Sequence, residues 1–308
     1  MTSEKIIVGA GTEYPLNGLL TFPDAPSGPV PGAVLVHGSG PSDMDERVIR
    51  LTPFRDIAEG LAARGIAALR YDKRTYAHAR KLAKPGITVK EETVDDAITA
   101  IGMLKRDPRV DPDRVFVLGH SMGAMLAPRI DAEGGDVRGM ILMAGTPYRL
   151  EDIVLRQLKQ AGGGKSLLRW IVGLEYKAYA KKFADLYRMS DEEAKKKKFA
   201  GNLSLYYFKE MGQKTAADYL LESTKPALLM QGERDFQVLA DDDFRAFETL
   251  LAGRENTFFK RYPGLNHVFV DAIYDDILKA SKEYGVERHI GDMVLDDLAA
   301  FIGNVTAQ

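Results

Sequence analysis

Short apolar runs alternate with segments of helical periodicity through most of the chain. This alternation is typical of a mostly parallel sheet whose strands are joined by crossover helices. Polar turn residues separate the first two strands, which we expect to pair as an antiparallel hairpin at the sheet edge. The predicted strands are 5–8, 16–21, 33–36, 66–71, 115–118, 140–144, 227–230 and 257–262, and the predicted helices are 53–64, 91–106, 121–130, 241–251 and 287–302.

The alternation stops between Pro147 and Thr224, a segment with no convincing strand. It holds Trp170, the only tryptophan, together with a concentration of tyrosine and phenylalanine. A connection this long inside a compact domain is usually structured or functional. The pattern therefore predicts an α/β catalytic domain formed by residues 1–146 and 225–308, with a helical cap inserted at 147–224.

One motif in the chain points to nucleophilic chemistry. The predicted strand 115–118 leads directly into GHSMG at 119–123, and a helix-compatible stretch follows. A G-x-S-x-G sequence between a strand and a helix is typical of a serine nucleophile held in a sharp, strained turn. Gly119 and Gly123 avoid Cβ atoms that would collide with neighbouring chain. Ser121 is therefore the predicted nucleophile.

A serine nucleophile that attacks a carbonyl needs two N–H donors for the oxyanion that forms. The strand 33–36 ends in the glycine-rich sequence HGSGP, whose backbone can approach a substrate closely. The residue after the nucleophile supplies the other donor. We therefore expect the backbone N–H groups of Ser39 and Met122 to form the oxyanion hole.

The five histidines make the search for a general base almost exhaustive. His267 follows the last predicted strand, and the loop that carries it belongs to the same sheet edge as Ser121. It is therefore the predicted base. The other four are expected in supporting positions: His120 within the turn and directed away from the serine, His37 bracing the glycine-rich loop, His78 in a charged stretch and His289 at the start of a helix.

The imidazole also needs a carboxylate that fixes its tautomer and stabilises its charged form. Asp235 follows the strand 227–230 at the position expected for this acid, and Glu233 and Asp241 are nearby competitors. Residues 241–243 fit better as the first turn of the next helix, where carboxylates complement the helix dipole. The order Ser121, Asp235, His267 is that of the α/β-hydrolase fold.

Five sequence blocks between residues 37 and 269 together resemble the bacterial EstD-type carboxylesterases of the α/β-hydrolase superfamily, relatives of the prolyl-oligopeptidase-like and cinnamoyl esterases. The blocks are HGSGPSDMDE, LRYDKRT, GHSMGAMLAPRI, QGERDFQV and GLNHVF. The resemblance implies the α/β-hydrolase fold, with a mostly parallel central sheet and flanking helices, and catalysis without a cofactor. It implies Ser121, Asp235 and His267 as the triad, with Ser39 and Met122 as oxyanion donors. The chain departs from many relatives at Ala124, where they have a second glycine.

The block LRYDKRT leaves two interpretations open. Tyr71, Asp72, Lys73 and Arg74 follow a strand at the predicted active edge, so their side chains are candidates to line the site. A salt-bridged structural corner fits the same residues.

Composition narrows the chemistry further. The absence of cysteine excludes a cysteine nucleophile, cysteine-ligated zinc and disulfides, and no HExxH pair or close histidine cluster suggests a metal. A net charge of −2 gives no reason to expect nucleic acid, and no apolar run approaches the ~18 residues of a membrane span. No secretory signal is visible at the amino terminus, so cytoplasm is the default expectation.

These observations predict a serine carboxylesterase that hydrolyses small to medium acyl or aryl esters through an acyl-enzyme. Its partner is a small-molecule ester, and exposed aromatic residues of the cap are candidates for a homodimer surface. An amidase or oligopeptidase-like hydrolase and a thioesterase are alternatives with the same residues. A catalytically silent hydrolase fold that serves as a binding protein is the alternative from another class.

Overall fold

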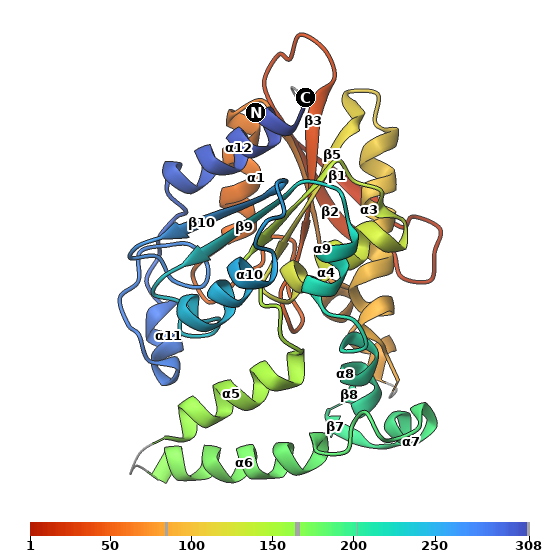
Figure 1. The fold of residues 1–308 in the computed structure, drawn as a ribbon. Helices are drawn as coiled ribbons and strands as arrows, with labels where there is room; N and C mark the ends of the chain where they lie inside the picture. The colour runs from red at the N-terminus through yellow and green to blue at the C-terminus, as the bar shows by residue number, and fades with distance from the viewer. Residues whose placement is uncertain (84–85, 164–166, 202, 307–308) are drawn as a thin grey trace.

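A twisted central sheet organises the molecule (Figure 1). The computed structural model describes residues 1–83, 86–163, 167–201 and 203–306. Within these residues the main sheet has eight strands in the order β1-β2-β4-β3-β5-β6-β9-β10. The strands are β1 (Thr2–Val8), β2 (Leu16–Phe22), β3 (Val30–Val36), β4 (Ala67–Tyr71), β5 (Val110–His120), β6 (Gly139–Met143), β9 (Ala227–Gly232) and β10 (Thr257–Tyr262).

The predicted edge hairpin and parallel core are both confirmed. β1 and β2 pair antiparallel, with Val8 opposite Leu16, and β2 also pairs antiparallel with β4. From β4 to β10 all neighbouring strands are parallel. Parallel strands are covered on both faces, which is why β3, β4 and β6 are buried along their whole length.

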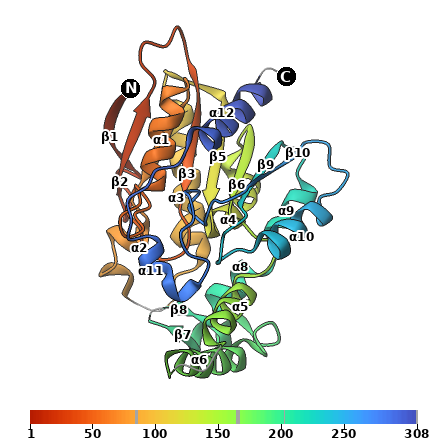
Figure 2. The same cartoon turned by 90° about the vertical axis from the view of Figure 1, so that its left-hand side faces the viewer.

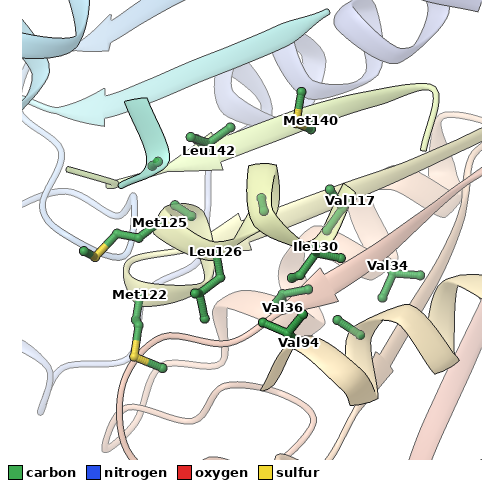
Figure 3. Packing of buried hydrophobic residues seen from close by; sticks show 14 of the residues in the cluster. Val34, Val36, Val94, Val117, Met122, Met125, Leu126, Ile130, Met140 and Leu142 are labelled. Atoms are coloured by element: carbon green, nitrogen blue, oxygen red, sulfur yellow. The ribbon is translucent and has the colours of Figure 1, made fainter. Parts of the chain in front are cut away.

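Helices cover both faces of the sheet (Figure 2). Alternate residues of β3 point to opposite faces, so Leu35 packs in the cluster with α1 (Pro53–Ala63) and α12 (Asp292–Thr306). Val36 belongs to the opposite cluster, in which Leu126 and Ile130 of α4 point towards the sheet (Figure 3). Helices of this second face include α3 (Asp95–Arg106), α4 (Met122–Ile130) and α10 (Arg245–Leu250), and the short α2 (Arg74–Ala77) and α11 (Ala280–Glu283) lie in connections.

The segment 147–224, which we call the insertion, joins β6 to β9 and lies at the end of the molecule opposite the termini (Figure 1). Its helices α5 and α6 pack against each other, and α9 packs against α4. Its elements are α5 (Leu150–Gly162), α6 (Leu167–Phe183), α7 (Asp191–Lys196), β7 (Lys198–Ala200), β8 (Leu203–Ser204), α8 (Leu205–Met211) and α9 (Ala216–Glu222). The prediction that it contains no strand was wrong, because β7 and β8 are too short to show an alternating pattern.

Three helix starts also differ from the predictions. The helix predicted at 91–106 begins with a π-turn at Lys90–Val94, and α3 starts at Asp95. The helix predicted to begin at 287 begins at Asp292, so His289 precedes it instead of opening it. Asp56 of α1 accepts hydrogen bonds from the His289 ring (3.0 Å) and from the backbone N–H of Ile290 (3.1 Å), and these bonds hold the segment in the preceding loop. The helix predicted at 241–251 starts with a wide π-turn at Ala240–Phe244.

Candidate active site

Ser121 lies in a strained turn between β5 and α4. Its φ of 54° and ψ of −116° fall where a side chain is rarely tolerated. A Cβ on Gly119 would come within 2.1 Å of the Gly123 carbonyl oxygen, and one on Gly123 would come within 2.1 Å of the Val36 carbonyl oxygen. The predicted steric role of both glycines is confirmed. The turn places Ser121 at the carboxyl edge of the parallel strands, with Met122 as the first residue of α4.

The structure brings Asp235 and His267 together. Nδ1 of His267 donates a hydrogen bond of 2.7 Å to Oδ2 of Asp235, and both side chains are buried. The other oxygen of Asp235 accepts from the backbone N–H groups of Gln237 (2.7 Å) and Val238 (3.0 Å). Gln231 of β9 donates to Oδ2 (3.0 Å). These bonds fix the carboxylate, which in turn holds the imidazole with Nδ1 towards Asp235.

Of the two competing carboxylates, Glu233 is exposed and Asp241 forms a surface ion pair. Asp241 has an 82% exposed side chain and pairs with Arg245 at 3.1 Å. Asp243 is buried in the same turn, accepts from Thr146 Oγ1 (2.6 Å) and forms an ion pair with Arg156 of α5. It thus ties the insertion to the turn after β9.

The glycine-rich loop after β3 is held from several sides. This loop borders a hollow of about 220 Å³, which is lined by Ser39, Ser121 and His267 among others. His37 is buried, and its Nε2 donates to the Asp43 carbonyl (2.9 Å), so the predicted bracing of this loop is confirmed. The backbone N–H of Gly38 donates to Glu46 Oε1 at 2.6 Å.

A buried ion pair lies beneath this hollow. Nδ1 of His120 contacts Oε2 of Glu46 at 2.9 Å, and its Nε2 donates to the carbonyl of His267 (2.9 Å). Burial alone would lower the pKa of His120, but Glu46 beside it raises that pKa above its ordinary value. Burial alone would raise the pKa of Glu46, but His120 and the Gly38 amide hold it below its usual range. His120 thus supports the loop that carries His267.

A larger cavity of about 400 Å³ opens beside Ser121 and Met122. Its walls are mostly apolar and come from both the insertion and the main sheet's connections. The insertion contributes Leu150, Ile153, Val154, Gln157, Phe199, Leu203, Tyr207 and Phe208. The remainder of the chain contributes Leu82, Ile87, Met125 and Val238, among others. Glu92 is a polar member of the wall, and its Oε2 accepts from Tyr207 Oη at 2.5 Å.

Charged residues of the block LRYDKRT form ion pairs, and one of them contacts the glycine-rich loop. Arg70 pairs with Asp45 (2.9 Å), and Arg74 pairs with Asp96 (2.5 Å). Lys73 donates to the Gly38 carbonyl at 2.8 Å. Of the two open interpretations, the salt-bridged corner describes Arg74 with Asp96 and Lys73 with Glu92 (3.4 Å). None of the residues 71–74 is among the described residues that line the cavity or the hollow.

Sequence reasoning missed four polar residues of the site: Glu46, Glu92, Tyr207 and Gln231. Glu92 and Tyr207 lie outside every sequence block, because each acts through a partner far away along the chain. Gln231 opens the block QGERDFQV, but the sequence does not show its hydrogen bond to Asp235. Glu46 lies in the block HGSGPSDMDE, so the resemblance marked its neighbourhood without indicating its role.

Among the described residues, no group of three or more His, Cys, Asp or Glu is arranged to hold a metal ion. No helix in the described ranges has the length and apolar character that crossing a membrane requires.

Comparisons with known proteins agree on one family. A family model described as alpha/beta hydrolase family matches residues 33–276. The chain is 35% identical over 289 residues to the esterase EstD of Thermotoga maritima. The aligned region covers 93% of this chain and 65% of EstD, so the chain spans a little under two thirds of that protein's length. It is 30% identical over 125 residues to the thiohydrolase apmlB of Arthrinium phaeospermum, covering 36% of this chain and 40% of that one.

Solved structures agree at the level of the fold. The esterase Est1E from Butyrivibrio proteoclasticus has a TM-score of 0.60 at 17% identity, covering 99% of both chains. An esterase from Pyrococcus furiosus has a TM-score of 0.59 at 15% identity, covering 99% of this chain and 91% of that one.

Proposed function

Because this chain belongs to the alpha/beta hydrolase family, we propose that it is a serine carboxylesterase that works through an acyl-enzyme. One observation carries the proposal. Ser121, in its strained turn, lines the same hollow as His267, and Nδ1 of His267 is hydrogen-bonded to the buried Asp235. The similarity to the esterase EstD over 93% of the chain supports ester hydrolysis as the reaction. In this proposal Ser121 is the nucleophile, His267 the base and Asp235 the orienting acid.

The proposed reaction has two half-reactions. His267 takes the proton of Ser121 as the hydroxyl oxygen attacks the ester carbonyl carbon. The oxyanion that forms is bound by the N–H groups of Ser39 and Met122. His267 then gives its proton to the leaving alcohol, and a water molecule activated by the same imidazole releases the acid and restores the serine.

The apolar cavity beside Ser121 supports small to medium acyl or aryl groups as the substrates. Its volume of about 400 Å³ suits a small ligand, and its apolar walls give binding energy to hydrocarbon groups. We propose that the insertion, residues 147–224, acts as a cap over a catalytic domain formed by residues 1–146 and 225–308. The eight residues of the insertion in the cavity wall support this division.

Replacing the serine tests the proposal directly. Ser121→Ala should lower kcat on p-nitrophenyl acetate and butyrate by at least about 10³-fold, because the nucleophile of the covalent step is lost. The wild-type protein should be labelled by a fluorophosphonate probe and the variant should not. Full activity in Ser121→Ala would overturn the assignment, and a wild-type protein that neither labels nor hydrolyses any ester would favour a binding protein with a silent hydrolase fold.

A thioesterase is the second candidate, favoured by the partial similarity to the thiohydrolase apmlB. A thioester needs the same serine, histidine and oxyanion donors, so the residues do not separate the two reactions. Rates on an oxygen ester and a thioester with the same acyl chain separate them. A kcat/KM on the thioester at least about 10-fold higher, a difference of about 1.4 kcal/mol, would favour the thioesterase.

Two further proposals concern the whole protein. A homodimer through the insertion is supported by large apolar side chains exposed on α6, among them Trp170, which is 60% exposed. The cytoplasm stays the proposed compartment, and cell fractionation with an antibody against the protein tests it.

A further inference from the structure

Lys73 is a buried lysine whose ammonium group contacts backbone of the glycine-rich loop. Its side chain is 2% exposed, and its Nζ donates a hydrogen bond of 2.8 Å to the carbonyl oxygen of Gly38. Its backbone N–H donates to the carbonyl of Ser42 in the same loop (3.0 Å). The positive charge of Lys73 therefore lies directly against the loop that carries Ser39.

The oxygen that Lys73 contacts belongs to the same peptide group as the N–H of Ser39. This peptide is trans and planar, so the Gly38 carbonyl and the Ser39 N–H point in opposite directions. A donor that fixes the oxygen therefore fixes the direction of the N–H. A cation on the oxygen also draws electron density from the amide, which makes the N–H a stronger donor, because hydrogen bonds in series polarise one another.

From this geometry we propose that Lys73 is a positioning residue of the oxyanion hole: its ammonium group anchors and polarises the Gly38–Ser39 peptide, so that the Ser39 N–H binds the tetrahedral oxyanion more strongly. The inference rests on the proposed function, because it requires Ser39 to be an oxyanion donor. Lys73 acts through this peptide, since it is not among the described residues that line the cavity or the hollow at Ser121.

A buried network holds the ammonium group in place. Oε1 of Glu92 lies 3.4 Å from Nζ of Lys73 and accepts from Thr75 Oγ1 at 3.0 Å. Oε2 of Glu92 accepts from Tyr207 of α8, so the insertion contributes to the same network. On the other side of the loop, Glu46 accepts from the N–H of Gly38 at 2.6 Å. Gly38 is thus held at both of its peptide groups.

The burial of the Lys73 ammonium group indicates a functional role. Burial lowers the pKa of Lys73, and the carboxylates of Glu92 and Glu46 oppose that shift. An apolar side chain of similar volume often fills such a site with no loss of stability, whereas a buried ion pair needs good geometry to offset its desolvation. A cation aimed at one backbone carbonyl beside a reactive serine is the arrangement that electrostatic preorganisation requires.

The test compares Lys73→Met, Glu92→Gln and the double variant. Lys73→Met removes the charge but leaves Glu92 buried without it, so this variant risks misfolding. The double variant removes both charges together, and its comparison with Glu92→Gln isolates the contribution of Lys73. Thermal unfolding of each variant checks that the fold is intact, and kcat and KM are measured on p-nitrophenyl butyrate.

We expect Lys73→Met/Glu92→Gln to have a kcat about 10- to 100-fold below that of Glu92→Gln, with KM within about 3-fold, since one oxyanion donor is weakened rather than removed. The inhibition constant of an alkyl trifluoromethyl ketone, which forms a tetrahedral oxyanion on an active serine, should rise by a similar factor. Equal kcat values in the two proteins, or a loss confined to KM, would overturn the proposal, because Lys73 would then only neutralise Glu92.

Lys90→Met is the matched control, because Lys90 forms surface ion pairs with Asp95 and Glu133 close to Glu92 in the sequence. It should keep the wild-type kcat. Ser121→Ala, assayed in parallel, separates the two proposals. If Ser121→Ala stays active, the proposed function fails; if only the Lys73 comparison shows no effect, the role of Lys73 fails while the triad stands.

Discussion

His37 shows how a single buried imidazole links the glycine-rich loop to pH. Its side chain is buried beside the rings of Phe54 and Tyr71, and its Nε2–H donates to the Asp43 carbonyl. Burial, reinforced by the charge of Lys73 and opposed by Glu46, lowers the pKa of His37 to about 4. The folded protein therefore holds this histidine in its neutral form.

This pKa predicts a loss of stability in mild acid. The unfolded chain binds the proton near pH 6.5 and the folded chain only near pH 4, so the stability that His37 contributes is present above pH 6.5 and is lost as the pH falls towards 4. Between pH 7 and pH 5 the loss from this group is about 2 kcal/mol.

The measurement is urea unfolding of the wild type and of His37→Gln at both pH values. The glutamine keeps a donor but does not titrate, so the difference in unfolding free energy between the two proteins should shrink by about 2 kcal/mol at pH 5. A difference that is the same at both pH values would show that His37 is not the titrating group.

At the scale of elements, α5 forms part of the wall of the apolar cavity beside Ser121. The cavity wall includes Leu150, Ile153 and Val154 of α5 together with Met122 and Met125 of α4. The pairing of Asp243 with Arg156 helps to fix α5 against the turn after β9. The acyl preference should therefore respond to the volume of side chains on this one helix.

Val154→Trp fills part of the cavity. We expect kcat/KM on p-nitrophenyl octanoate to fall at least about 10-fold, because each methylene kept out of an apolar pocket costs about 0.8 kcal/mol. Hydrolysis of the acetate should stay within about 3-fold of the wild-type value. Lys159→Trp, an exposed position on the same helix, is the control and should keep the wild-type chain-length profile. An unchanged preference in Val154→Trp would place the acyl group elsewhere.

At the scale of the whole molecule, α6 presents an apolar stripe to solvent. Leu167, Trp170, Ile171 and Leu174 are 45–73% exposed, and their spacing puts them on one face of the helix. Such an arrangement is typical of a surface that another chain covers. The proposed homodimer assigns this stripe to a second copy of the same chain.

Trp170→Glu/Leu174→Glu tests the homodimer. Light scattering after size-exclusion chromatography should give twice the chain mass of 34.0 kDa for the wild type and a single chain mass for the variant. Lys196→Glu changes the charge of the insertion at an exposed position of α7, outside the stripe, and should leave the dimer intact. A wild-type protein that runs as a monomer at about 50 μM, well above the concentrations at which stable dimers form, would contradict the proposal.

Local rules were enough to predict the elements on which the site is built. The strand 257–262 was predicted at its observed bounds, and α1 ends within one residue of its prediction. Both depend on interactions between near neighbours in sequence: hydrophobic periodicity and turn chemistry. The π-turn at Ala240–Phe244 and the late start of α12 were missed, because contacts with distant residues, such as Asp56 with Ile290, decide them.

By itself the sequence determined the candidate chemistry of this protein. The G-x-S-x-G turn can form only with glycine at 119 and 123, and a chain with five histidines and no cysteine leaves few choices for base and nucleophile. Only the tertiary structure decided which charges serve the site. Lys73 meets the Gly38 carbonyl, and Glu92 meets Tyr207, across gaps of 35 and 115 residues. A buried charge needs a partner of opposite charge or a hydrogen-bonding group, and the fold supplies that partner from a distant part of the chain. No local sequence pattern predicts such a pair.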